Sequence, residues 1–160
     1  MANVLVFGYG NLSRGDDALG PLVLEYIEQN SYFDGLEIIT DFQLQIEHAL
    51  DLEGRDLVLF IDASVACDQA FSFVTLAPEK DKSYTTHAMS PASVLSVYQD
   101  IMHKQSPPCF LLSIQALEFE LGSDLSARAR SNLDVANTFV RQLLANPELG
   151  FWLDCESNTL

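Results

Sequence analysis

The sequence predicts an α/β fold, a three-layer α/β/α sandwich with a mostly parallel, doubly wound sheet of about five strands. Short apolar runs rich in β-branched and aromatic residues alternate along the chain with segments of helical periodicity. The chain has 160 residues, of which 48% are hydrophobic and 19% are charged, a balance typical of a folded chain with one core. We expect one domain at residues 1–146 and a loosely held C-terminal tail at residues 147–160.

The N-terminal part predicts a strand, a glycine-rich loop and a helix. Residues 4–7 form a short apolar run that ends at glycine, which is typical of a buried first strand. Residues 17–27 carry apolar side chains at helical spacing, and Asp16 or Asp17 is available as a cap. The chain therefore begins with a β-loop-α unit.

The middle of the chain predicts two strands, a short helix and an edge strand. Residues 36–40 predict a second strand and residues 46–50 a short helix. Residues 57–61 form an uninterrupted apolar run, typical of burial on both faces, that ends at Asp62. Residues 71–76 predict an antiparallel edge strand, because too little chain precedes them for a crossover helix.

The last third of the chain predicts two helices around a strand. Ser90 and Pro91 are a cap and a first helical residue, and the helix should run to about His103. Residues 110–114 predict a buried strand, and residues 125–144 a long amphipathic helix.

The charge excludes some partners. Eight basic residues against 23 acidic ones give a net charge of −15, which repels phosphate backbones and anionic membranes.

The three cysteines are widely separated and form no pair, so we expect reduced thiols. The N-terminus lacks a basic segment, and no run reaches the ~18 apolar residues of a membrane span. We expect a cytoplasmic monomer that binds neither nucleic acid nor membrane.

Three polar residues could meet at the carboxyl edge of the sheet, where open α/β sheets bind ligands. They are Asp17, Asp62 and His87. Two carboxylates and an imidazole suit a divalent ion such as nickel or zinc. Each residue alone also has an ordinary structural explanation, as a helix cap, a loop anchor or a lone histidine.

Other routes of catalysis and binding have weak support. The chain has no G-x-S-x-G elbow and no cysteine with a nearby base, so metal-activated water is the favoured hydrolytic route. The segment GYGNLSRG at residues 8–15 suggests a dinucleotide loop, but Ser13 stands where the third glycine belongs. Asp16 and Asp17 would also repel phosphate at the helix start. We expect no organic cofactor.

These segments resemble a known family. The runs GYGNL at residues 8–12 and GDDALG at residues 15–20 are similar to the N-terminal signature of the hydrogenase maturation proteases. The resemblance continues through FIDA at residues 60–63 and the Ser-Pro pair at 90–91, and covers most of residues 3–145. It implies an endopeptidase that removes a C-terminal peptide from the nickel-loaded precursor of a NiFe hydrogenase large subunit. Nickel would be supplied by that precursor, the expected partner.

The resemblance also implies which residues form the site. Asp17 and Asp62 match the metal-contacting carboxylates of the family and are the expected catalytic pair. Asp16 would cap the helix, although an exchange of roles between Asp16 and Asp17 stays open.

The histidine ligand is expected at His87. Some relatives place it directly after the Ser-Pro pair, where this sequence has Ala92, and His87 lies just before that pair. His48 and His103 lie in helical patterns and are poorer candidates.

Two further expectations complete the prediction. Residues 41–47 and 118–122 resemble the branch of the family that serves bidirectional, NAD(P)-linked hydrogenases. The alternative function is a noncatalytic, nickel-sensing chaperone for the same subunit.

Overall fold

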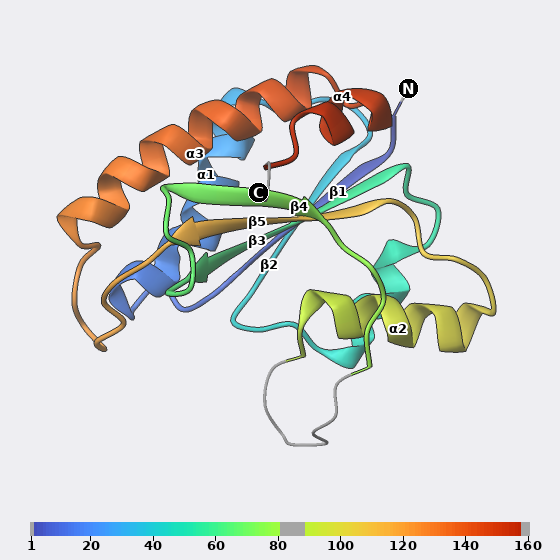
Figure 1. Ribbon diagram of the computed structural model, residues 1–160, viewed down its shortest axis with the longest axis horizontal. Coiled ribbons are helices and arrows are strands. Elements are labelled where there is room, and N and C mark those ends of the chain that lie inside the picture. The colour runs from blue at the N-terminus through green and yellow to red at the C-terminus, as the bar shows by residue number, and fades with distance from the viewer. Residues whose placement is uncertain (1, 81–88, 158–160) are drawn as a thin grey trace.

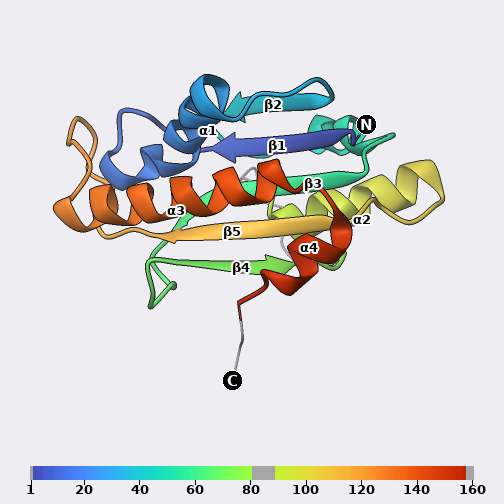
Figure 2. The same ribbon diagram turned by 90° about the horizontal axis from the view of Figure 1, so that it is seen from above.

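A five-stranded sheet between two layers of helices forms the protein in the computed structural model, which describes residues 2–80 and 89–157 (Figure 1). The strands are β1 (Val4–Tyr9), β2 (Leu36–Asp41), β3 (Leu57–Ser64), β4 (Phe71–Thr75) and β5 (Cys109–Gln115). Their order across the sheet is β2-β1-β3-β5-β4 (Figure 2). Neighbouring strands pair in parallel except β4, which is antiparallel to β5 at the edge. The predicted fold class and edge strand are confirmed.

Helices cover both faces of the sheet. They are α1 (Leu19–Asn30), α2 (Pro91–Met102), α3 (Ala127–Ala145) and α4 (Leu149–Asp154), with the 3₁₀ turns η1 (Gly15–Ala18) and η2 (Ile46–Leu52). α1, α3 and α4 lie on one face, and α2 and η2 on the other (Figure 1). α2 begins as predicted, because the Ser90 side chain accepts a hydrogen bond from the Ser93 N–H at 3.1 Å. Among the described residues, no helix combines the length and the apolar character that crossing a bilayer requires.

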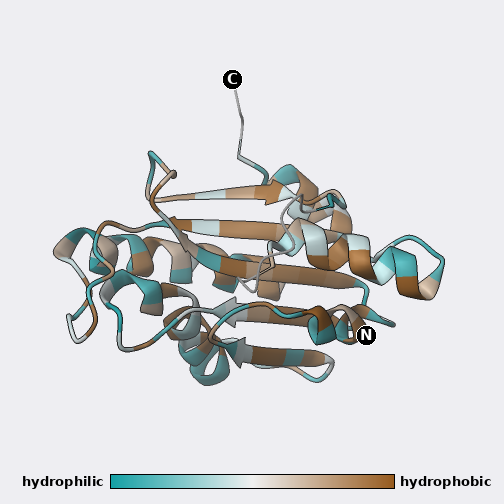
Figure 3. Cartoon of the chain, turned by 90° about the horizontal axis from the view of Figure 1, so that it is seen from below, coloured by the Kyte–Doolittle hydropathy of each residue, from teal (hydrophilic) through white to brown (hydrophobic). Residues whose placement is uncertain are grey.

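The sheet separates two apolar cores. On the α2 face the rings of Phe7 and Phe60 stack with centroids 5.0 Å apart. On the α3 face Phe73 and Phe110 stack at 5.1 Å. The central strands are hydrophobic over most of their length (Figure 3) because both faces are covered. This rigid, dry sheet positions the loops at its carboxyl edge.

The start of the first helix differs from the prediction. The 3₁₀ turn η1 precedes α1, and neither element receives a hydrogen bond from a capping side chain. Asp16 and Asp17 therefore are not caps, and both carboxylates accept hydrogen bonds from other parts of the chain.

The C-terminal segment also differs from the prediction of a loosely held tail. Trp152 is fully buried, and its indole N–H donates to the Leu143 carbonyl at 2.9 Å. Farther along, the Ser157 N–H donates to the Phe73 carbonyl at 2.8 Å, beside edge strand β4. The sequence-based expectation was wrong because the chain folds back and the large indole side chain fills the α3-side core.

Candidate functional site

The carboxyl ends of β1 and β3 border the point where the order of the strands reverses. β2 lies on one side of β1 and β3 on the other, so the chain leaves these strands in diverging directions. In open α/β sheets, ligands bind at the carboxyl edge beside such a divergence. Asp17 follows β1, and Asp62 lies two residues before the end of β3, which runs to Ser64 rather than stopping at Asp62 as predicted.

Asp62 is a half-buried carboxylate that resists ionisation. Burial raises its pKa to about 6, and the negative charge of Asp17 adds to the rise. The Ala63 N–H and the Tyr9 hydroxyl act in the opposite direction. The turn η1 and the last residues of β3, far apart in sequence, thus bring Asp17 close enough for its charge to act on Asp62.

Asp17 is held by the glycine-rich loop. Its Oδ2 accepts a hydrogen bond from the Asn11 N–H at 2.7 Å. Gly10 has a φ of 145°, and a Cβ there would lie 2.0 Å from the Asp17 carbonyl oxygen, so only glycine lets the loop pass this closely. The loop amide that could bind an anion is occupied by the protein's own carboxylate, which argues further against a nucleotide phosphate.

A second close approach fixes the helix that follows Asp17. A Cβ on Gly20 would lie 2.8 Å from the carbonyl oxygens of both Tyr9 and Ile61. α1 therefore packs directly over the junction of β1 and β3. The position of Asp17 relative to Asp62 is thereby set by backbone packing.

Asp16 has a different role from Asp17. Its side chain is fully buried and accepts hydrogen bonds from the N–H groups of Leu117, Glu118 and Ser126, at 2.8, 3.1 and 2.7 Å, and from the Ser126 hydroxyl at 2.8 Å. Burial opposes its ionisation, but these hydrogen bonds prevail and hold the pKa of this carboxyl below its usual range. Asp16 therefore anchors the loop after β5.

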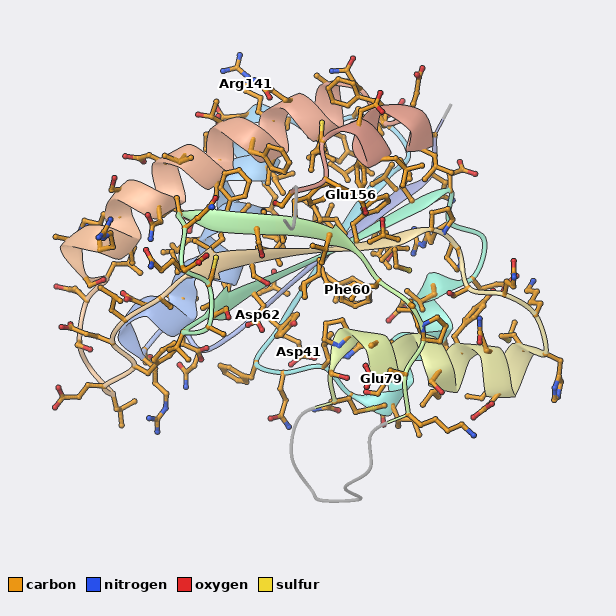
Figure 4. The ribbon with its side chains drawn as sticks, in the orientation of Figure 1. Asp41, Phe60, Asp62, Glu79, Arg141 and Glu156 are labelled. Carbon is orange, nitrogen blue, oxygen red and sulfur yellow. The ribbon has the colours of Figure 1, made fainter. Side chains whose placement is uncertain are left out.

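Two residues that the sequence-based reasoning missed lie in one row with Asp62. Tyr9 pairs with Asp41 in the register of β1 and β2, and Gly8 pairs with Ile61 in that of β1 and β3, so Tyr9, Asp41 and Asp62 face the same side. Asp41 and Asp62 both lie on the α2 side of the sheet (Figure 4). The only signal for Tyr9 and Asp41 in the sequence is that each ends a strand.

The Tyr9 hydroxyl lies near Asp62. It is buried and makes no hydrogen bond of normal geometry to any residue that the structure describes, yet it is near enough to Asp62 to favour the ionised carboxylate. Burial, and then the charge of Asp62, raise the pKa of Tyr9 far above its usual value. Tyr9 therefore stays a neutral donor.

Of the histidines considered as ligands, His48 can be placed in the structure and His87 cannot. His87 lies outside the described residues, so its predicted role stays a prediction. His48 is buried, with Nδ1 accepting from the Gln45 N–H at 2.8 Å and Nε2 at 3.3 Å from Asp41 Oδ2. Both its nitrogens are engaged. Within residues 2–80 and 89–157, no three acidic, histidine or cysteine side chains cluster in a way that could hold a metal.

Comparison with known proteins gives structural matches. No family model matches the sequence, and no curated protein is significantly similar to it. The NiFe hydrogenase maturation protease HycI from Thermococcus kodakarensis matches with a TM-score of 0.70 and 21% identity, over 91% of this chain and 94% of that one. The hydrogenase maturating endopeptidase HybD from Escherichia coli matches with a TM-score of 0.70 and 23% identity, over 91% and 93%.

A third match extends this group. A hydrogenase 2 maturation peptidase from a Thaumarchaeota archaeon has a TM-score of 0.64 and 21% identity, over 89% of this chain and 98% of that one. At such identities the likeness establishes the fold. The chain has the fold of these maturation proteases across nearly its whole length.

Proposed function

We propose that this protein is a hydrogenase maturation endopeptidase that removes the C-terminal extension from the nickel-loaded precursor of a NiFe hydrogenase large subunit. Two findings support the proposal: the fold shared with maturation proteases, and the similarity of residues 8–20 to the signature of that family.

The observation that carries the proposal is that Asp17 and Asp62 lie near enough at one edge of the sheet for the charge of Asp17 to raise the pKa of Asp62. Burial, and to a lesser extent the charge of Asp17, make ionisation of Asp62 unfavourable, as the raised pKa of Asp62 records. A divalent cation between the carboxylates would relieve both costs, since an opposite charge favours the ionised form. The site is therefore suited to a cation that arrives with a substrate.

In the proposed reaction, nickel is part of the substrate. Asp17 and Asp62 would contact it, with His87 as the expected third ligand, and so align the scissile bond. A bound divalent ion polarises a carbonyl and lowers the pKa of water, which supplies the chemistry of hydrolysis. Without nickel the carboxylates have no shared cation, alignment is lost, and cleavage does not follow.

The specific hydrogenase is a further part of the proposal. The segments 41–47 and 118–122 follow the ends of β2 and β5, so both flank the carboxylates at the carboxyl edge. Their similarity to the branch serving bidirectional, NAD(P)-linked hydrogenases supports a substrate of that kind.

The alternative is a noncatalytic nickel-sensing chaperone that binds the precursor while another protein cuts. It is favoured by one observation: the described residues supply two convergent carboxylates but no three-residue metal cluster. Binding of nickel-loaded precursor without cleavage would identify this role.

The test combines purified precursor with this protein alone. Asp17→Asn and Asp62→Asn should slow processing by roughly 10²-fold or more, seen as loss of the gel shift of the large subunit. Asp134→Asn is the matched control, because Asp134 is exposed on α3, away from the sheet edge. Circular dichroism should show that all three variants fold. Processing by both site variants at the wild-type rate would contradict the proposal.

A further inference from the structure

Exposed apolar side chains gather on the loops around the two carboxylates. These five residues, called the apolar rim below, are Leu12 (61% exposed), Phe42 (73%), Val65 (72%), Leu117 (55%) and Leu121 (63%). Each follows the carboxyl end of a parallel strand: β1, β2, β3 or β5. The other large apolar side chains that are exposed among the described residues lie on η2, α2, α3 and α4 and in the turn after α1.

The loops that carry the rim are joined to one another. Backbone hydrogen bonds run from the Gly10 N–H to the Asp41 carbonyl (3.0 Å), from the Gly122 N–H to the Ser13 carbonyl (2.6 Å), and from the Ala116 N–H to the Ser64 carbonyl (3.0 Å). The buried Asp16 adds a further tie between the loops after β1 and β5. The segments that bear the rim are thus fixed relative to one another, which makes the rim a preorganised surface.

The rim lies in a strongly acidic setting. The four segments that bear it, residues 10–18, 41–47, 62–70 and 115–126, contain a single basic residue, Arg14. Besides the buried Asp16, they contain eight carboxylates: Asp17, Asp41, Glu47, Asp62, Asp68, Glu118, Glu120 and Asp124. A partner must therefore offer apolar side chains together with positive charge.

We propose that the apolar rim docks an extended segment of the large-subunit precursor in which apolar residues alternate with lysine or arginine. The inference rests on the proposed function and adds the chemistry of the recognised segment. The rim residues lie on the segments that carry or adjoin Asp17 and Asp62, so a chain that reaches these carboxylates passes beside them. In a homodimer through this face, the acidic residues around the rim would face the same acidic residues of the second copy. The repulsion between these like charges disfavours such a dimer.

The first test needs no cleavage. A fluorescein-labelled 12-residue peptide of alternating leucine and arginine is titrated with the wild-type protein and with Leu121→Ser and Phe42→Ser, and binding is followed by anisotropy. We expect the rim variants to bind about tenfold more weakly, equal to about 1.4 kcal/mol. Val135→Ser, which removes a similarly exposed apolar side chain from α3, should bind like the wild type. A leucine-glutamate peptide should bind at least tenfold more weakly than its arginine counterpart.

The second test uses the nickel-loaded precursor. The rim variants should raise KM about tenfold and leave kcat within twofold, because the rim contacts the segment in both ground and transition states. Equal peptide binding and equal KM in rim and control variants would overturn the docking proposal while leaving the endopeptidase intact. Rim-dependent peptide binding without any precursor cleavage would refute the endopeptidase and keep the docking surface.

Discussion

Replacing Asp16 with alanine should destabilise the protein severely without touching the reacting atoms. The substitution removes four hydrogen bonds and leaves the N–H groups of Leu117, Glu118 and Ser126 without an acceptor. An unsatisfied buried donor costs about 1–3 kcal/mol. Water entering the space left by the carboxyl group would recover part of this, so we expect a loss of about 3–5 kcal/mol. Set against a typical stability of about 5–15 kcal/mol, that is a large fraction.

Urea unfolding at neutral pH measures this loss, with Asp17→Ala as the comparison. Asp17 accepts one hydrogen bond, from Asn11, on a half-buried side chain, so its removal should cost only about 1 kcal/mol. Hydrogen exchange should also show lost protection of the Leu117 and Ser126 amides in the Asp16 variant alone. If the two variants unfold within 1 kcal/mol of each other, the assignment of Asp16 as the anchor of the loop after β5 is wrong.

The same anchor should respond to acid. The pKa of Asp16 is lower in the folded state than its ordinary value, so the unfolded chain binds the proton more readily. The contribution of Asp16 is therefore complete above about pH 4 and is lost as the pH falls through the folded-state pKa. In the alanine variant this part of the acid sensitivity should disappear.

Three further predictions concern packing and charge. Gly20→Ala should cost about 1–3 kcal/mol, because the added methyl group meets two carbonyl oxygens at 2.8 Å, whereas Gly150→Ala, with no atom within 4 Å, should be neutral or slightly stabilising in a thermal melt. Trp152→Ala should cost about 3–5 kcal/mol in urea unfolding, since the fully buried indole packs on Phe73 and Phe110. For Asp62, whose pKa is raised to about 6, the wild type should lose about 2–3 kcal/mol between pH 4 and pH 7 as the carboxyl ionises. Asp62→Asn should lack that loss and be the more stable protein at neutral pH, and equal pH profiles would contradict this reasoning.

Local signals were sufficient for most of the fold. The apolar run at residues 57–61 and the Ser90-Pro91 pair predict β3 and the start of α2, because strand burial and helix capping depend on neighbouring residues. The strand ends also predicted that Asp17 and Asp62 would lie at one edge, since parallel strands bring their carboxyl ends together.

Contacts between distant residues explain what the sequence did not predict. Asp16 and Asp17 are adjacent and identical in type, and what separates their roles is a loop about a hundred residues away. The row of Tyr9, Asp41 and Asp62 depends on the register of three strands, which no single segment encodes. The burial of Trp152 likewise depends on the core offered by Phe73 and Phe110.

Two kinds of contact at the carboxyl edge would divide the work of recognition. The apolar rim can hold an extended segment whether or not the precursor carries nickel, because apolar contacts do not depend on the metal. Such uniform binding lowers KM without accelerating the chemical step. Asp17 and Asp62 behave in the opposite way, since at neutral pH a cation between them would favour the ionised carboxylates. Under the proposed function, nickel-free precursor should accordingly compete for binding and escape cleavage.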